Sequence, residues 1–338
     1  MSGALIDLVS KGVQDVYLSG DPQVSFYRQN YKRHTNFSMK PVELKPIGQQ
    51  VAGSEIVLPI ERKGDLLTYV WCDTDTPGGD DDSSIQTSLN KTPTEFSLHI
   101  GGIEIERQDA FFINYLWPAF LAPTSSKNVV PSDKKFFPLH FFHCDTQTTP
   151  LPLVATQYHN AEIRVKHSVK SAPAGVKYYA NYVMLDTDER KFFVDNRHDL
   201  LITQTQKVQA TEKGADLMYL NHPVKAVMWG HDESITTSNV QLRINGTDVF
   251  DTLMPGKYFS NVASYYHTKS ANYTSDKVFM YPFGLYPCEH QPTGSCNFSR
   301  LDNAKFTWDT DISPKYAYAV NYNILTVDKG LAGLKFSN

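Results

Sequence analysis

The stretch that decides the fold is Leu98-His-Ile-Gly-Gly-Ile-Glu-Ile105, which has a counterpart in Leu242-Arg-Ile-Asn-Gly-Thr-Asp-Val249. In each, strand-forming residues flank a Gly-Gly or Asn-Gly dipeptide. Such dipeptides tolerate the positive φ angles that a two-residue type I′ turn requires at both central positions. Each stretch therefore predicts a β-hairpin, and the pair predicts that this hairpin occurs twice in the chain.

Two further pairs of similar segments occur in the same order along the chain. They are Thr68–Trp71 with Ala226–Trp229, and Asn160–Val165 with Asn303–Trp308. The distance along the chain from the hairpin to the second of these segments is nearly the same in both halves. A fixed order with fixed spacing is the mark of an internal repeat. We therefore predict two copies of one β-sandwich.

The rest of the chain consists largely of short runs rich in Val, Ile, Tyr, Phe and Thr, separated by Gly, Pro, Asn and Asp. Many short strands without intervening helices indicate an all-β sandwich or barrel architecture. The expected strands are 55–60, 66–71, 96–100, 103–106, 161–165, 178–185, 225–229, 240–244 and 316–327.

The N-terminus is the exception, because its apolar residues have helical spacing. Leu5, Leu8, Val9, Val13 and Val16 recur every three or four positions, which predicts a short amphipathic helix ending before the turn signal at 19–22. Such a helix must cover its apolar face, either against another protein or against its own domain. Charges at positions 7 and 11 interrupt the apolar run, so we expect neither a signal peptide nor a membrane span.

Composition limits the classes of function. The chain has 338 residues and 12% aromatic residues, which excludes disorder as its main state. A net charge of −4 supplies no phosphate-neutralising surface, so we expect no direct nucleic-acid binding. The four scattered cysteines, Cys72, Cys144, Cys288 and Cys296, are typical of reduced thiols in a protein made in the cytosol, with a Cys288–Cys296 disulfide as the alternative.

Two polar stretches divide the chain. The segment 73–84 has no counterpart in the second copy and is expected to be an exposed loop inserted in the first. The charged stretch 186–199 is expected to contain the boundary between the copies, near residue 195. The predicted organisation is an N-terminal segment at 1–24, a first sandwich at 25–194 and a second at 195–338.

Several strings carry a resemblance to a known family. They are Gly3–Val9, Gln14–Tyr27, Tyr31–Ser38, Leu151–His159, Leu185–Arg190, Tyr281–Pro287, Gln291–Asn303, Tyr318–Leu325 and Gly330–Asn338. With these strings the chain resembles, nearly from end to end, the double jelly-roll major capsid proteins of nucleocytoplasmic large DNA viruses, of the phycodnavirus and iridovirus type. The chain is shorter than is common in that family, with the difference expected in its loops.

The resemblance implies two tandem eight-stranded jelly rolls that stand perpendicular to a capsid surface. It further implies a homotrimer that forms a pseudo-hexagonal capsomer, contacts neighbouring capsomers and tiles the icosahedral shell of a large double-stranded DNA virus. Residues 1–24 would face the capsid interior and contact minor capsid proteins, and an internal membrane could lie near them. The protein would be made and assembled in the host cytoplasm and function in the virion.

Other functions remain open on the sequence alone. Within the same fold, the chain could be a minor capsid, penton or assembly-scaffold relative. Jelly rolls also host carbohydrate-binding proteins, in which exposed Tyr and Trp stack on sugar rings. A cupin-type metalloenzyme would need several histidines and a glutamate converging inside one barrel, and the scattered histidines do not supply them.

The densest cluster of ligand-type residues is His140-Phe-Phe-His-Cys-Asp145. We expect a strand here, so His140 and His143 would point to opposite faces and hold no zinc. Cys288, His290 and Cys296 share a loop region, where a reactive or metal-bound thiol is conceivable but a fourth ligand is missing. Structural thiols are the simpler interpretation.

The segment Asp73–Ser84 begins like a calcium loop but has Pro77 and Ser84 at its fifth and twelfth positions, which excludes an EF-hand. A solvated acidic loop or a loose cation site is expected instead. Neither a Gly-x-Ser-x-Gly elbow nor a Gly-rich phosphate loop occurs. We therefore expect no enzyme and assign no catalytic, cofactor-binding or metal-binding residue.

Glycosylation sequons occur at Asn36, Asn90, Asn245, Asn272 and Asn297. Host N-glycosylation requires passage through the secretory pathway, for which the N-terminus carries no signal. We interpret the sequons as coincidental, although sugar could be attached to outward loops by another route.

Overall fold

The computed structural model describes residues 3–73, 94–124, 127, 136–168, 176–211, 213–230, 239–269, 278–309 and 316–337. The chain divides into two units, Met1–Asn36 and Phe37–Asn338. In the first unit every described side chain is exposed. It contains α1 (Gly3–Val9) and α2 (Val16–Ser19).

The helical character of the N-terminus is confirmed, but the expectation of one continuous helix is wrong. The backbone N–H of Gly12 donates a hydrogen bond to Oδ2 of Asp15 at 2.7 Å. This local bond to an aspartate competes with continuation of the helix, and α2 begins after the resulting turn.

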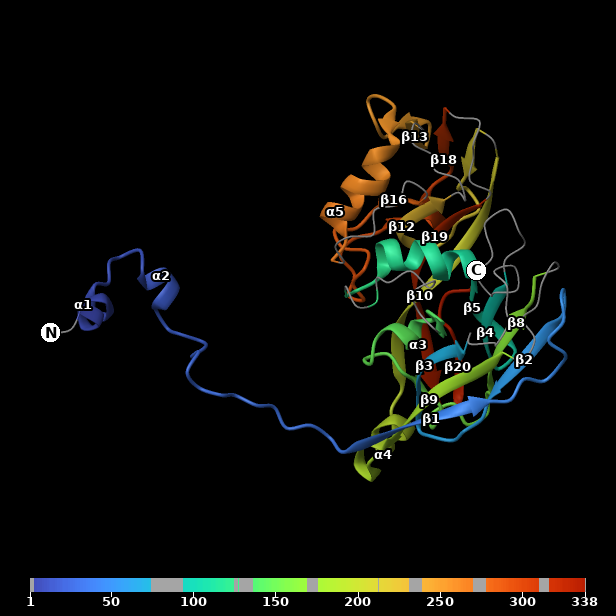
Figure 1. Ribbon diagram of the computed structural model, residues 1–338, viewed down its shortest axis with the longest axis horizontal. Coiled ribbons are helices and arrows are strands. Elements are labelled where there is room, and N and C mark those ends of the chain that lie inside the picture. Colours follow the sequence, from blue (N-terminus) through green and yellow to red (C-terminus); the bar gives the residue numbers. More distant parts are fainter. Residues whose placement is uncertain are drawn as a thin grey trace. The chain divides into compact units, whose positions relative to one another are not determined.

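The first half of the second unit is a sandwich of two antiparallel sheets, which lie in the lower part of Figure 1. One sheet has the order β1-β9-β3-β6, with β7 also paired to β3. The other has the order β2-β8-β4-β5. The bounds are β1 Phe37–Leu44, β2 Glu55–Ile60, β3 Leu66–Asp73, β4 Glu95–Ile100, β5 Ile103–Asp109, β6 Phe136–Pro138, β7 Leu151–Pro152, β8 Ala161–Lys166 and β9 Lys177–Leu185.

The second half repeats this order. Its strands follow the paths β10-β19-β12-β16 and β11-β18-β13-β14, and a short pairing between β10 and β11 joins them into one 11-stranded sheet. The bounds are β10 His198–Thr211, β11 Gly214–Asp216, β12 Pro223–Gly230, β13 Asn239–Ile244, β14 Thr247–Asp248, β15 Met254–Pro255, β16 Val278–Pro282, β17 Cys296–Asn297, β18 Ala304–Trp308, β19 Tyr316–Asp328 and β20 Leu331–Leu334.

The two strand orders correspond element by element. The pairs are β1 with β10, β2 with β11, β3 with β12, β4 with β13, β5 with β14, β6 with β16, β8 with β18 and β9 with β19. Each half is thus an eight-stranded jelly roll, as predicted, and every expected strand is present with its ends within three residues. From here the halves are called the first and second roll.

The hairpins that predicted the repeat have the expected turns. Gly101 and Gly102 have φ angles of +60° and +82°, and Asn245 and Gly246 have +49° and +81°. The first turn residue of each hairpin also donates its backbone N–H to an asparagine carbonyl at the start of the neighbouring strand. These bonds are Gly101 to Asn160 at 2.9 Å and Asn245 to Asn303 at 2.7 Å.

One sequence equivalence is shifted by a residue. The sequence comparison paired Trp71 with Trp229, but these side chains lie on opposite faces of their sheets. Trp229 is buried in the second roll, whereas Trp71 lies between the fully buried Val70 and Cys72 and faces outward. Trp71 pairs with Tyr179 and Met228 pairs with Tyr318, so Trp71 corresponds to Met228.

Helices between the strands were not predicted, and the expectation that none intervene is wrong. A π-helix, η1 (Phe112–Leu121), lies between β5 and β6, and η4 (Tyr258–Val262) continuing into α5 (Ala263–His267) takes the same place in the second roll. α4 (Thr187–Asp195) joins the rolls. Two single turns, α3 (Phe142–Asp145) and η5 (Phe298–Arg300), complete the helices of the described residues.

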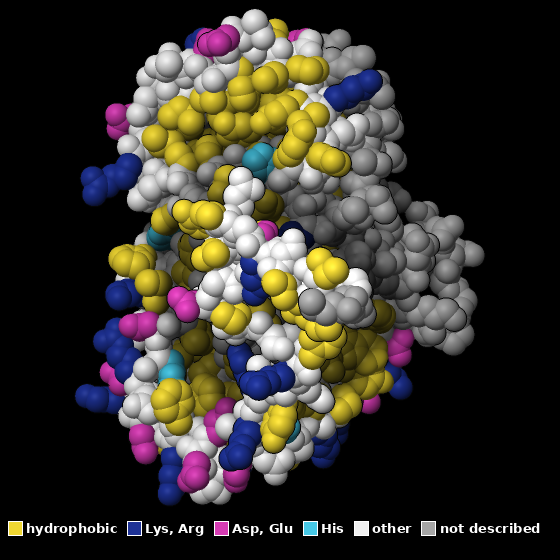
Figure 2. Space-filling model, turned by 90° about the vertical axis from the view of Figure 1, so that its left-hand side faces the viewer, with side chains coloured by type: hydrophobic (Ala, Val, Ile, Leu, Met, Phe, Trp, Pro, Cys, Tyr) yellow, Lys and Arg dark blue, Asp and Glu magenta, His cyan; other side chains and the backbone are white. Residues whose placement is uncertain are grey.

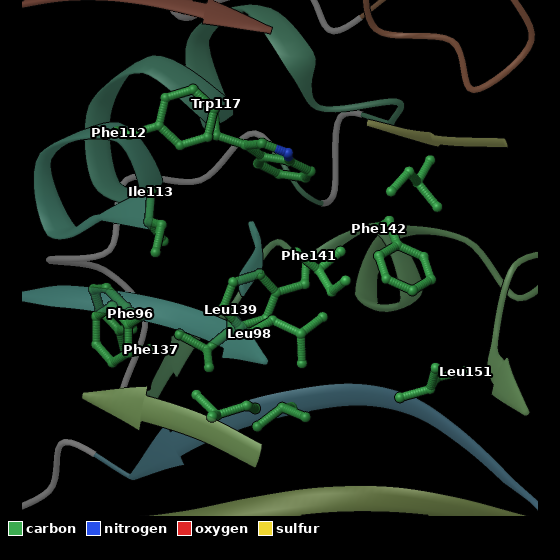
Figure 3. Close-up of a cluster of buried hydrophobic side chains, with 14 of the residues drawn as sticks. Phe96, Leu98, Phe112, Ile113, Trp117, Phe137, Leu139, Phe141, Phe142 and Leu151 are labelled. Atoms are coloured by element: carbon green, nitrogen blue, oxygen red, sulfur yellow. The ribbon is translucent and has the colours of Figure 1, made fainter. Parts of the chain in front are cut away.

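The core explains why the rolls form one unit. Aromatic rings meet between the two layers of each sandwich, as in the stack of Phe96 on Phe137 at 5.5 Å and the contact of Trp229 with Phe306 at 4.9 Å. The first hydrophobic cluster extends from the first roll through η1 to side chains of β12, β16 and β19. Figure 3 shows Phe112, Ile113 and Trp117 of η1 above the buried side chains of the first roll.

Candidate functional site

The joint between the two rolls is formed by η1 on the outer face of the second roll. η1 packs against β16 and β12, and the rings of Phe111 and Phe112 lie 6.2 and 5.8 Å from that of Tyr318. The outward side chains Met228 and Met280 are fully buried there. Around these residues, the outer sheet face of the second roll is thus covered by a helix of the first roll.

Asp109 links the two rolls at this joint through hydrogen bonds and an ion pair. Its Oδ1 accepts the backbone N–H of Phe112 at 2.9 Å, at the start of η1. Its Oδ2 accepts the hydroxyl of Tyr318 at 2.7 Å and lies 2.8 Å from Nζ of Lys207. The aspartate side chain is 1% exposed, so one buried carboxylate links the first roll to β10 and β19 of the second.

The corresponding outer face of the first roll is aromatic, and within the part of the chain that the structure describes it is only partly covered. Trp71 stacks on Tyr179 at 4.5 Å and meets Phe136 edge-on at 6.1 Å. Tyr69 and Phe136 are 46% and 42% exposed. Tyr69, Trp71, Phe136 and Pro138 line a hollow of about 500 Å³, and Tyr179 lies beside it under Trp71. We call Tyr69, Trp71, Phe136, Pro138 and Tyr179 the aromatic platform.

The helix that corresponds to η1 has one exposed side. Tyr265 and Tyr266 of α5 are 79% and 66% exposed, and their rings lie 4.9 Å apart. The end of α5 is held by the following loop, where Nδ1 of His267 is 3.0 Å from the carbonyl oxygen of Leu285 and Lys269 pairs with Glu289. Figure 2 shows hydrophobic side chains gathered in the upper part of one face and again in a hollow lower down.

A polar cavity of about 300 Å³ lies at the joint between the rolls, lined by Glu106 and Lys225 among others. Burial raises the pKa of the Glu106 carboxyl to about 8, against the lowering effect of hydrogen bonds from Gln108 at 2.6 Å and Thr205 at 3.1 Å. Burial lowers the pKa of the Lys225 ammonium to about 8. Among the described residues no ion pair forms on Lys225, whose Nζ lies 5.7 Å from the ring centre of Tyr322.

Lys225→Met is expected to raise the free energy of unfolding by about 2–3 kcal/mol at pH 7, because one pKa unit corresponds to about 1.4 kcal/mol. Below pH 8 the ammonium is charged in both states and its desolvation cost is fully present. As the pH rises from 8 to 10.5, the native state loses the proton first, and the cost disappears. The gain over wild type should therefore vanish above about pH 10.5.

Urea unfolding between pH 6 and pH 11 measures this difference, with the exposed Lys305→Met as the matched control. An equal gain at both ends of the pH range would show that desolvation of Lys225 is not its cause.

The histidine cluster is structural, but not for the expected reason. Residues 142–145 form the single helical turn α3, not a strand. Nδ1 of His140 lies 2.8 Å from Oδ1 of Asp145 and its ring stacks on Trp117 at 3.4 Å, while Nδ1 of His143 lies 2.6 Å from the carbonyl oxygen of Thr68. Burial lowers the pKa of His143 to about 4. The two histidines thus have different partners, as expected.

Of the remaining candidates, Cys288 and His290 both line the cavity between the rolls. Cys72, Cys144, Cys288 and Cys296 are free thiols. Burial raises the pKa of Cys288 and lowers that of His290. No group of three or more His, Cys, Asp or Glu residues in the described ranges is arranged to hold a metal ion. Of the acidic loop 73–84, all but Asp73 lies outside the described residues.

The sequons that can be placed have local structural contacts. Oδ1 of Asn245 accepts the backbone N–H groups of Asp302 and Asn303 at 3.0 and 3.3 Å. Oδ1 of Asn297 accepts that of Ser299 at 3.1 Å. Asn36 is exposed, and Asn90 and Asn272 lie outside the described residues.

Sequence reasoning missed both the aromatic platform and the exposed α5. The signal for the platform was present, because residues 69–72 are apolar at every position. A strand with one face in water alternates apolar and polar residues instead. An uninterrupted apolar strand in an antiparallel sheet indicates that its second face is also covered. The adjacent tyrosines at 265 and 266 gave no comparable signal.

Within the described residues, no helix has both the length and the apolar run that a bilayer crossing requires.

Comparisons with known proteins find relatives that align with the whole chain. A family model described as "Large eukaryotic DNA virus major capsid protein" matches residues 231–333, and one described as "Major capsid protein N-terminus" matches residues 25–176. The chain is 32% identical to the major capsid protein of Pyramimonas orientalis virus and 27% identical to that of Paramecium bursaria Chlorella virus 1, with both chains covered completely in each case.

Solved structures share the fold. The crystal structure of PBCV-1 VP54, fitted into a reconstruction of the virophage Sputnik, matches with a TM-score of 0.78 at 22% identity, covering 93% of this chain and 100% of that one. The Faustovirus major capsid protein matches with a TM-score of 0.67 at 10% identity, covering 96% of each chain.

Proposed function

Because this chain belongs to the major capsid protein family of large eukaryotic DNA viruses, we propose that three copies of it assemble into a capsomer with a six-sided outline. The chain is a structural protein of the virion. The observation that carries the proposal is the repeated strand order, because two rolls of one design in each chain give a ring of three chains six similar sectors. Such a ring can tile a hexagonal lattice.

The organisation proposed for this role follows the repeat. We place the boundary between the rolls near residue 195, at the end of α4, so that 25–194 and 195–338 form the two sectors. Neighbouring capsomers would meet through polar, weaker contacts, which let misplaced capsomers dissociate. The role requires no catalysis, and assembly would take place in the host cytoplasm.

The N-terminal segment is proposed to contact other capsid proteins on the inner side of the shell. Its exposed apolar side chains include Val13, Tyr17 and Leu18, each at least 84% exposed. A segment with so much apolar surface needs a partner to cover it. Minor capsid proteins beneath the shell are the proposed partners of residues 1–24.

In solution, the purified protein is expected to be a stable species of three times 38.2 kDa. The physical reason is that uncovered aromatic surfaces such as the platform favour association over exposure to water. Sedimentation velocity or light scattering coupled to gel filtration measures the mass. A protein that remains monomeric at micromolar concentration would contradict the proposal.

A further inference from the structure

The joint between the two rolls of one chain pairs a helix of one roll with the outer sheet face of the other, and the same kind of pairing is available between two chains. Within the chain, the helix that follows β5 covers the outer face of the next roll. The helix in the same place in the second roll, η4–α5, buries Phe259 and Ala263 but leaves Tyr265 and Tyr266 exposed. The described part of the outer face of the first roll is also partly exposed. The internal joint is made of a helix and the sheet face that it covers. Among the described residues, the molecule presents a second helix and a second sheet face of these two kinds, each partly exposed.

Strand register makes this equivalence specific. Trp71, opposite Tyr179 on β9 and Pro138 on β6, occupies the place that Met228 has opposite Tyr318 and Met280. In the second roll these positions are buried under η1. In the first roll they belong to the aromatic platform, where they are partly exposed.

We propose that η4–α5 of one copy docks on the aromatic platform of the next copy. The inference rests on the trimer proposed above and names the surfaces that join its chains. Tyr265 and Tyr266 would enter the hollow beside Trp71 and Phe136.

The platform is continuous with the interface that already exists inside the chain. His140 and Asp145 line both its hollow and the polar cavity between the rolls. A copy docked on the platform therefore extends the covered surface that begins at the internal joint. The chemistry also matches, because tyrosines pack their rings against aromatic neighbours and keep their hydroxyl groups at a wet rim.

Two different surfaces meet in this contact, so it is heterologous. Each copy offers its α5 to one neighbour and its platform to the other. Such contacts close into a ring when the rotation between copies divides a full turn. If the contact between chains repeats the geometry of the internal joint, three copies alternate internal and external joints around the ring.

The first test uses one lysine on each surface, in the full-length chain. Phe136→Lys on the platform and Tyr265→Lys on α5 are each expected to convert trimer to monomer at the concentration where the wild type is trimeric. Circular dichroism and the monomer's thermal unfolding should show an intact fold, because both side chains are substantially exposed. Tyr219→Lys, at a residue 72% exposed on another surface, is the matched control and should remain trimeric.

The second test mixes the two variants. Phe136→Lys retains a sound α5 and Tyr265→Lys retains a sound platform, so one good contact can form between them. The expected product is a heterodimer of one copy of each variant, detected by native mass spectrometry with one variant isotopically labelled. A ring cannot close, because the next contact would join two altered surfaces.

The outcomes separate this inference from the proposed function. Two trimeric lysine variants would overturn the docking contact and leave the trimer standing. Loss of the trimer in Phe136→Lys alone would show that a segment other than α5 occupies the platform. That result would also overturn the docking contact. A mixture that stays monomeric would mean that the two surfaces do not meet each other. A monomeric wild type would overturn both the trimer and the contact derived from it.

Discussion

Asp109→Ala is expected to lower the free energy of unfolding by about 3–5 kcal/mol, the range typical of a broken buried charge pair. The replacement leaves the hydroxyl of Tyr318, the ammonium of Lys207 and the first N–H of η1 without the carboxylate that now accepts them. Buried donors without acceptors are costly because water cannot replace the lost partner. Because these donors come from both rolls, their separation should become easier.

Chemical denaturation followed by tryptophan fluorescence measures this effect. Asp109→Asn should lose less, since its amide oxygen can still accept the N–H of Phe112. Asp248→Ala is the matched control, because that aspartate pairs with Arg243 at 2.7 Å on the surface. Equal, small losses in Asp109→Ala and Asp248→Ala would show that the buried carboxylate does not hold the joint.

Trp229→Ala is expected to cost about 3–5 kcal/mol of stability, as large-to-small changes of buried aromatic residues do. Trp229 is 3% exposed, and its ring lies within 6 Å of the rings of Phe259, Phe279 and Phe306. These residues belong to a hydrophobic cluster of the second roll that is separate from the cluster spanning the joint.

The same unfolding experiment measures this loss, and Tyr219→Ala, 72% exposed in the same roll, is its control. A Trp229 variant as stable as the Tyr219 variant would mean that the aromatic cluster repacks around the gap.

The fold was predictable from sequence where local chemistry decides the local structure. The dipeptides at 101–102 and 245–246 require a tight turn whatever surrounds them, and the runs beside them favour strands. The repeat was visible because hairpins and strand starts recur in order. η1 was not predictable, because nine of its ten residues are buried and it therefore lacks the polar face that gives a helix its periodicity.

The surfaces proposed to interact were harder to predict from the sequence, for a similar reason. Which face of a strand a residue occupies depends on bulges, and the register shifts between Leu67 and Val70 in β3 and between Val224 and Ala226 in β12. Trp71 and Trp229 are alike in sequence, yet one faces outward and the other inward. A tryptophan facing outward cannot be distinguished by type from a buried one, because exposure is decided by what packs on the strand.

The preformed joint between the rolls has a consequence for how fast and how faithfully a ring can assemble. Bringing free bodies together costs translational and rotational entropy at every encounter. Six separate rolls would need five encounters to close a ring, whereas three chains with two rolls already locked together need only two. Covalent linkage of two rolls in one chain replaces diffusion for half of the joints. The joints inside a chain can then differ in sequence from those that must form between molecules.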